Sequence, residues 1–285
     1  MHTAFISSAP HPAPDLNTFL CRLRDAPAVL VTVSATRGSV PREAGTWMAV
    51  FDRDAVGTIG GGRLEWDAIR RARDMLARRA VEPDVQSVTL GPSLGQCCGG
   101  AVTLGYEPVQ AAHIDALRLR LSTPRSPVAL FGGGHVGRAI VQALAPLPFD
   151  LTWVDSRDEV FPSLVPPGVH TEHSAPVQGA VADLPAGSHV LVMSFSHAED
   201  LDIVAACLDR LRDNDDLGFI GLIGSRTKWA TFRRRLMERG HGEAALARVT
   251  CPIGIPGIEG KAPEVIAASV AAQLLLVESQ RGGAA

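Results

Sequence analysis

The chain has 285 residues, of which 46% are hydrophobic and 20% charged, and its net charge at pH 7 is −3. This length accommodates two ordinary domains, and the composition is typical of a globular protein. The charge argues against nucleic-acid binding, which requires a basic excess or a basic face, and no apolar run approaches the length of a membrane span.

The first fifteen residues are rich in proline and have neither a basic segment nor a continuous apolar core. We therefore expect residues 1–15 to be a disordered lead-in and not a secretory signal. The five cysteines are odd in number and irregularly spaced, which does not fit a disulfide framework. We expect a cytoplasmic protein with reduced thiols, in which Cys21, Cys207 and Cys251 serve as small packing residues.

Residues 16–122 are predicted to form a small α/β domain. Hydrophobic periodicity predicts strands at 29–34, 47–51, 85–90 and 101–106 and helices at 64–79 and 111–121. The segment 122–127 is rich in proline and serine, and is therefore predicted to be the linker to a second domain.

Strand and helix alternate throughout residues 127–285. The predicted strands are 128–131, 151–154, 190–193 and 219–223, and the predicted helices are 136–144, 199–212, 227–239 and 263–278. This alternation indicates a mostly parallel sheet that is covered on both faces. The fold class is therefore α/β, with a small N-terminal α/β domain followed by a Rossmann-like doubly wound parallel-sheet domain.

Three glycines in G-x-G-x-x-G spacing follow the first strand of the second domain, and an aspartate ends the next strand about twenty residues later. In such a unit the first glycine permits a tight turn, the second lets a pyrophosphate approach the backbone, and the third lets the helix pack closely. A turn that serves packing alone is the alternative. The predicted binding residues are Gly132, Gly134, His135, Val136, Gly137 and Asp155.

Gln96, Cys97 and Cys98 lie in a glycine-flanked loop between two strands of the first domain. The adjacent cysteines lack the spacing of a zinc knuckle or a thioredoxin-type pair. Accessible thiols here are candidates for contact with a soft metal such as molybdenum, or for carrying sulfur as a persulfide. The alternative is that both are small buried hydrophobic residues.

Gly60, Gly61 and Gly62 form a second glycine-rich turn, at the start of the predicted helix 64–79. An anion is a candidate ligand for this helix N-terminus, and the turn that contains Arg42 is a candidate source of a cation for the same pocket. A tight connection with a solvated arginine explains the pattern equally well.

Three later loops of the second domain also carry candidate residues. His197 follows a strand and is a candidate general base, with Asp200 or Asp202 nearby in sequence, although a helix cap would look the same. The other candidates are Ser225, Arg226 and Lys228 for a phosphate, and Lys261, in a loop rich in proline and glycine, for closing over a ligand. A structural turn is the alternative for Lys261.

Taken in order, the motifs G-S-x-P-R, G-x-I-G-G-G, G-Q-C-C-G-G, G-G-G-H-V-G, S-H-x-x-D, I-G-S-R-x-K and P-I-G-x-P-G-I-x-G-K-x-P resemble those of the XdhC/CoxI family, over residues 16–276. The resemblance implies a molybdenum cofactor chaperone that binds a molybdopterin-type cofactor, supports its sulfuration with a cysteine desulfurase, and inserts it into xanthine dehydrogenase or a related molybdenum hydroxylase. It also implies that Gln96, Cys97 and Cys98 contact the cofactor or its sulfur, and that Gly132 to Gly137 with Asp155 form a nucleotide-type subsite. Such a protein has no turnover of its own, and a homodimer is expected because the bound cofactor must be shielded.

The sequence is also compatible with two other functions. One is an NAD(P)-dependent oxidoreductase that uses Asp155 on the ribose and His197 as acid and base. The other is a nucleotide-sensing regulator without catalysis. Neither explains the loop that contains Cys97 and Cys98.

Overall fold

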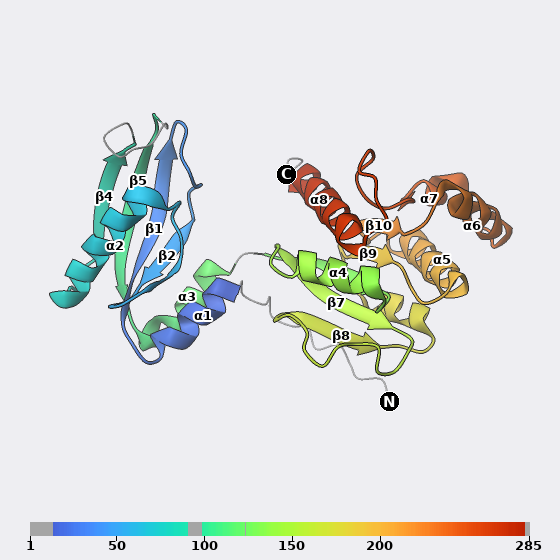
Figure 1. Ribbon diagram of the computed structural model, residues 1–285, viewed down its shortest axis with the longest axis horizontal. Coiled ribbons are helices and arrows are strands. Elements are labelled where there is room, and N and C mark those ends of the chain that lie inside the picture. The colour runs from blue at the N-terminus through green and yellow to red at the C-terminus, as the bar shows by residue number, and fades with distance from the viewer. Residues whose placement is uncertain (1–13, 91–98, 123, 283–285) are drawn as a thin grey trace. The chain divides into compact units, whose positions relative to one another are not determined.

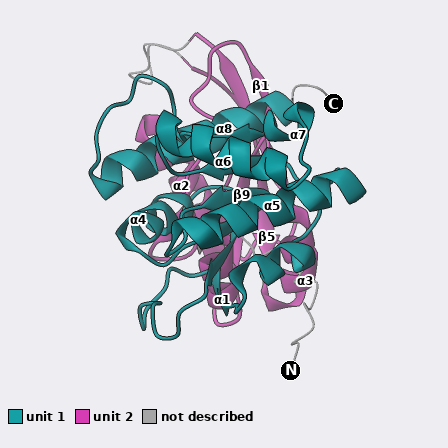
Figure 2. Ribbon diagram, turned by 90° about the vertical axis from the view of Figure 1, so that its right-hand side faces the viewer, with its two compact units in different colours: residues 1–11, 123–285 teal, residues 12–122 magenta. Residues whose placement is uncertain are grey.

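A computed structural model describes residues 14–90, 99–122 and 124–282. These residues form two compact units, one ending at residue 122 and the other beginning after residue 123 (Figure 1; Figure 2 colours them separately). Within the described ranges, none of the helices has the length and apolarity to cross a bilayer.

The first unit is built on one antiparallel sheet. Its elements are α1 (Pro14–Leu23), β1 (Ala28–Arg37), β2 (Trp47–Val50), β3 (Ala55–Gly57), α2 (Gly62–Ala77), β4 (Asp84–Thr89), β5 (Ala101–Val109), η2 (Ala111–His113) and α3 (Ile114–Leu121). The strand order is β3-β2-β1-β5-β4, and all of the pairs are antiparallel. The strand β4 therefore forms one edge of the sheet.

Both faces of this sheet are buried, which explains why β1 begins with a continuous apolar run. Val29, Val31 and Val33 pack with α2 on one face, whereas Ala28 and Leu30 pack with α1 and α3 on the other. Alternate residues of a strand point to opposite faces, so a strand covered on both sides needs apolar residues at every position.

The second unit is built on one parallel sheet. Its elements are β6 (Ser126–Phe131), α4 (His135–Leu144), β7 (Phe149–Asp155), β8 (Val169–His173), η3 (Val177–Asp183), β9 (His189–Val192), α5 (His197–Asp213), β10 (Phe219–Leu222), α6 (Arg226–Glu238), α7 (Glu243–Leu246), β11 (Val249–Thr250) and α8 (Pro263–Gly282). The order β11-β10-β9-β6-β7-β8 is the doubly wound Rossmann order. The order reverses between β6 and β9, and ligands of such sheets bind beyond the carboxyl ends of the strands at this point.

Helices cover both faces of the parallel sheet. On one face α4 and α8 pack on Val128 and Leu130 of β6, and on the other α5, α6, α7 and η3 pack on the side of Ala129 and Phe131. The predicted fold class is therefore confirmed: an antiparallel-sheet domain is followed by a Rossmann-like parallel sheet.

Several short elements were not predicted: α1, β3, β8, η3, α7 and β11. In β8 only Val169 is buried, and β11 has two residues, so neither has a measurable hydrophobic period. In contrast, α1 carries a usable signal, because Leu16, Phe19, Leu20 and Leu23 recur at helical spacing and are buried. Since α1 begins at Pro14, the last two residues of the expected lead-in belong to a helix; residues 1–13 lie outside the described part.

Candidate functional site

The turn after β6 contains two glycines that the fold requires and one that it does not. A Cβ at Gly132, whose φ is +129°, would lie 2.0 Å from the carbonyl oxygen of Met193, and a Cβ at Gly137 would lie 2.0 Å from that of Gly132. A Cβ at Gly134 would meet no atom within 4 Å, and its φ of −71° suits any residue. Packing therefore accounts for Gly132 and Gly137, whereas the surface at Gly134 is open.

The N-terminus of α4 begins at this open glycine. Gly134 is the N-cap, and no side chain caps the helix. The first N–H groups of a helix have no partner within it, and they attract an anion together with the helix dipole. His135, which is exposed, and Val136, which is half-buried, lie in this first turn. The arrangement provides backbone donors and open space for a phosphate group.

Asp155, at the end of β7, holds the turn in place. Its Oδ2 accepts hydrogen bonds from Gly133 N (2.6 Å) and Arg157 Nη2 (2.8 Å), and its Oδ1 from Arg157 N and Nε (2.9 Å each). Burial alone would raise the pKa of Asp155, but the hydrogen bonds from Arg157 and Gly133 lower it below its ordinary value. A carboxylate accepts about four hydrogen bonds, so Asp155 has no acceptor left for the ribose contact that the oxidoreductase alternative requires.

Arg157 extends the site from Asp155, to which it donates its hydrogen bonds, toward Phe195. Its guanidinium lies 4.5 Å from the ring centre of Phe195, the residue after Ser194, and that ring is 65% exposed. An exposed aromatic ring at the switch point of the sheet is a stacking surface for a heterocycle. The sequence signal for Arg157 was its position two residues after the aspartate, at a strand end.

His197 is the first residue of α5, and its ring packs edge-on against Phe232 at 6.3 Å. Neither predicted partner carboxylate bonds to it in the described structure: Asp200 accepts from Ser194 and Lys228, and Asp202 pairs with Arg239. The triad-like arrangement that a general base would need is therefore not formed by these residues.

The loop after β10 uses its polar groups internally. Ser225 caps α6 by accepting a hydrogen bond from Lys228 N (3.1 Å). Lys228 Nζ donates to Asp200 Oδ2 (2.6 Å) and to the carbonyl of Ile223 (2.8 Å), and both charged side chains are nearly buried. Arg226 is exposed at the first position of the helix. Of the predicted phosphate contacts here, only Arg226 has its charged group directed to solvent.

Lys261 is exposed in the loop just before α8. No described contact joins it to the glycine turn. Its proposed role in closing over a ligand stays a prediction.

Loops distant in sequence meet at one end of the first unit. A Cβ at Gly60 would lie 3.4 Å from Cγ of Arg42, so the structure brings the predicted cation to the glycine turn. However, Glu65 Oε2 accepts hydrogen bonds from the N–H groups of Ile59 (3.0 Å) and Gly61 (3.1 Å). A carboxylate of the chain itself thus occupies the anion position predicted at Gly60 to Gly62.

The loop with Gln96, Cys97 and Cys98 lies outside the described residues. Just after it, Gly100 packs so closely on the backbone of Arg37 and Ser39 that a Cβ would lie 2.3 Å from a carbonyl oxygen. Gly100 therefore lies beside the turn that leads to Arg42. In the described ranges, no three His, Cys, Asp or Glu side chains are placed to hold a metal ion.

The three other cysteines differ in environment. Cys207 is fully buried, which raises the pKa of its thiol to about 12, and burial raises that of Cys251 to about 11. Both thiols are therefore protonated at neutral pH, as packing residues would be. Cys21 is exposed on α1, contrary to the expected apolar setting, because it points away from the buried stripe of that helix.

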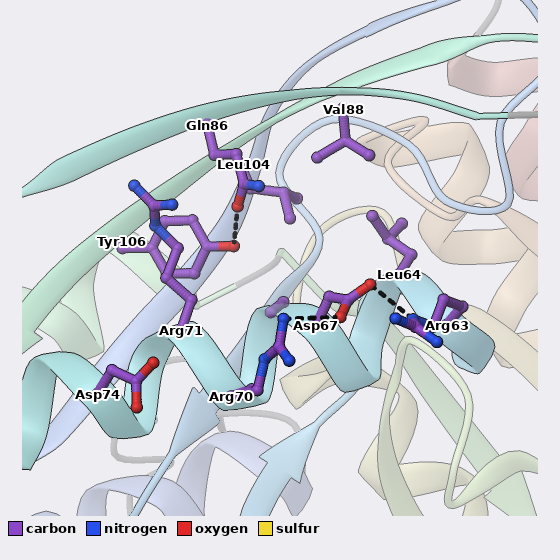
Figure 3. A pocket seen from close by; sticks show the side chains of 11 residues that line it. Arg63, Leu64, Asp67, Arg70, Arg71, Asp74, Gln86, Val88, Leu104 and Tyr106 are labelled. Atoms are coloured by element: carbon purple, nitrogen blue, oxygen red, sulfur yellow. Dashed lines mark hydrogen bonds and ion pairs between the residues drawn. The ribbon is translucent and has the colours of Figure 1, made fainter. Parts of the chain in front are cut away.

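A groove of about 450 Å³ runs between α2 and the strands β4 and β5 of the first unit (Figure 3). We call it the α2–β4 groove. Its lining residues are Arg63, Leu64, Asp67, Ala68, Arg70, Arg71, Asp74, Gln86, Val88, Leu104 and Tyr106. This groove was not predicted from the sequence, although the alternation of β4 places Gln86 and Val88 on the same side of the strand.

Comparison with known proteins covers both units. A family model described as the XdhC Rossmann domain matches residues 128–274, and one described as the XdhC and CoxI family matches residues 21–86. The uncharacterized protein YqeB of Escherichia coli is 30% identical over 265 residues, which are 91% of this chain but 45% of YqeB. The chain thus spans less than half the length of this curated relative.

A solved structure shares this architecture. A crystal structure described as a xanthine dehydrogenase from Bacillus halodurans has a TM-score of 0.75 at 20% identity, and the match covers 94% of this chain and 96% of that one. This likeness shows the fold. A Rossmann-fold NAD(P)-binding family protein from Shigella flexneri, at 16% identity, matches 55% of this chain and 87% of that one with a TM-score of only 0.36.

Proposed function

The chain belongs to the XdhC and CoxI family, and from this premise we propose that it is a molybdenum cofactor chaperone. In this proposal it binds the cofactor as cargo, protects it, supports its sulfuration by a cysteine desulfurase, and inserts it into xanthine dehydrogenase or a related molybdenum hydroxylase. The observation that carries the proposal is the match of family models to both units of the chain. A carrier of this kind needs a binding site but no catalytic group.

The second unit offers a site that fits the anionic part of such a cargo. The cofactor carries a phosphate, and its dinucleotide forms carry a pyrophosphate. The uncapped first turn of α4 supplies N–H donors, and the open surface at Gly134 leaves room for the oxygens. We propose that Gly134, His135 and Val136 contact this group, while Gly132, Gly137 and Asp155 hold the turn in shape.

Cys97 and Cys98 are the proposed sulfur-handling residues, with Gln96 beside them. A terminal sulfido ligand has to come from a persulfide, and a thiolate is both the nucleophile and the ligand in that chemistry. The thiol role therefore rests on the family and on the residue types.

The test is retention of cofactor by the purified protein. The protein is incubated with molybdenum cofactor, separated by gel filtration, and assayed for co-eluting molybdenum and pterin, with NAD run in parallel; the elution volume also tests the expected homodimer. We expect stoichiometric retention of cofactor. Retention of NAD without pterin would instead favour an oxidoreductase or a nucleotide-sensing regulator, although the saturated Asp155 speaks against ribose recognition of the usual kind.

Cysteine variants test the sulfur role. Cys97→Ala and Cys98→Ala should lower cofactor retention or the activation of apo-xanthine dehydrogenase without changing thermal stability. Cys21→Ala is the control, because Cys21 is an exposed cysteine on α1, away from the glycine-flanked loop in sequence. Activation at the normal rate by the double variant Cys97→Ala/Cys98→Ala would refute the thiol role.

A further inference from the structure

Phe195 is an exposed aromatic residue beside the glycine turn of the second unit. It follows the end of β9 at Val192, and the carbonyl of Met193, which lies between them in the chain, packs directly on Gly132. Two residues span at most about 7 Å, so the backbone of Phe195 stays close to the turn that leads into α4. Its side chain is nevertheless 65% exposed. A single exposed hydrophobic residue is common on protein surfaces, so the neighbours of the ring decide what it can do.

The backbone on both sides of Phe195 is fixed by hydrogen bonds. Ser194, before it, donates from its N–H and its hydroxyl to Asp200 Oδ1, at 2.8 Å each. Ser196, after it, caps α5 by accepting a hydrogen bond from Glu199 N at 3.2 Å. The flanking residues therefore hold the ring in place, although its own surface is open to solvent. A group that is already held in place loses little entropy when a ligand binds.

Arg157 connects the ring of Phe195 to the glycine turn. Its Nε and Nη2 donate to the two carboxylate oxygens of Asp155, at 2.9 and 2.8 Å, and Asp155 Oδ2 also accepts from Gly133 N at 2.6 Å. The guanidinium lies over the Phe195 ring, 4.5 Å from its centre. A guanidinium is planar and stacks on aromatic faces. The ring and the guanidinium thus form one surface for a planar group, and hydrogen bonds tie that surface to the turn before α4.

The charges around the ring disfavour a second anion. Arg157 is paired with Asp155 at 2.8 Å, and the hydrogen bond and charge of Asp155, together with the charge of Glu199, raise the pKa of Arg157. Glu199 Oε1 accepts a hydrogen bond from Ser156 Oγ at 2.5 Å, whereas its Oε2 accepts none from the described residues. Two carboxylates thus surround one guanidinium, which disfavours an anion and leaves an acceptor without a donor. A neutral planar group that carries N–H donors suits these surroundings.

We propose that Phe195 and Arg157 form a subsite for a nucleobase, which stacks on the open part of the ring while the phosphate groups of the same ligand lie at the start of α4. Stacking on an aromatic ring accepts any base, because every base has a π face. The subsite therefore selects a nucleotide and not one particular base. This inference rests on the proposed chaperone function and narrows its cargo to a dinucleotide form of the cofactor, with the nucleoside end on Phe195.

Calorimetric titration of the full chain with ADP, CDP, GDP and inorganic pyrophosphate tests the subsite. We expect Phe195→Ala to weaken binding of the nucleoside diphosphates about tenfold, through the lost stacking, and to leave binding of pyrophosphate unchanged. Phe195→Trp should keep the binding. Leu276→Ala is the control, because Leu276 is 53% exposed and lies near Glu278, which bonds to Ser126 and His189 at the opposite, amino ends of β6 and β9. Circular dichroism verifies that all three variants fold.

Unchanged binding of the nucleoside diphosphates by Phe195→Ala would overturn the subsite, as would nucleoside diphosphates that bind the unmodified protein no more tightly than pyrophosphate does. The cargo is tested separately. The unmodified protein should retain a dinucleotide form of the cofactor more tightly than the form without a nucleotide, and Phe195→Ala should remove the difference. Retention of neither form by the unmodified protein would refute the chaperone function, whereas the titration with nucleoside diphosphates by itself decides the subsite.

Discussion

Gly137→Ala should lower the free energy of unfolding of the second unit far more than Gly134→Ala does. At Gly137 the new Cβ would lie 2.0 Å from the carbonyl oxygen of Gly132, where ordinary contact begins near 3.4 Å. Either the start of α4 or the carbonyl of Gly132 must therefore move by more than 1 Å. That carbonyl accepts a hydrogen bond from Trp153 Nε1 at 2.9 Å in the core, which the movement would break.

The two costs can be combined. Overpacking of this kind costs about 1–3 kcal/mol, and leaving a buried donor unsatisfied costs about 1–3 kcal/mol more. We expect Gly137→Ala to lose about 4 kcal/mol, which lowers Tm by about 10 °C for a unit of this size. Gly134→Ala meets no atom within 4 Å, so it should lose only about 1 kcal/mol, through a poorer N-cap.

The assay is thermal unfolding followed by circular dichroism for both variants. Equal losses of Tm, or a larger loss for Gly134→Ala, would refute the assignment of these glycines. The same contrast makes a clean binding test: Gly134→Leu should keep near-normal stability but reduce cofactor retention about tenfold, because the side chain covers the open N-terminus of α4.

Three further predictions concern buried polar groups. Lys228→Met should lower the free energy of unfolding by about 3 kcal/mol or more, because Asp200 stays buried without its cation; a loss below about 1 kcal/mol in urea titration would contradict this. Tyr106 is the only tyrosine, and because burial raises its pKa to about 12, ultraviolet titration should show no transition near the ordinary value of about 10. Burial lowers the pKa of His189 below 6.5 despite its hydrogen bond to Glu278, so the unfolded chain binds more protons there. Stability should therefore fall as pH falls below about 6.5, by at most about 1.4 kcal/mol per pH unit from this group, and His189→Gln should reduce that slope; an unchanged slope would contradict the assignment.

The sequence by itself determined the fold class and the position of the glycine turn, because both depend on local patterns. Alternation of strand and helix at regular spacing predicts a parallel sheet, and the spacing of Gly132, Gly134 and Gly137 after a buried strand predicts a tight turn into a helix N-terminus. The strand end at Asp155 follows from the same local unit. Short elements such as β11 were missed because two residues carry no period.

Only the tertiary structure decided what each polar side chain contacts. Asp155 was a candidate for a nucleotide-type subsite, but its oxygens accept hydrogen bonds from Gly133 and Arg157. Glu65 occupies the anion position of the other glycine turn, and Lys228 is paired with Asp200. The α2–β4 groove likewise joins a helix and an edge strand that no local pattern links. The physical reason is that secondary structure follows from neighbours in sequence, whereas hydrogen-bond partners and cavities follow from side chains that packing brings together across the fold.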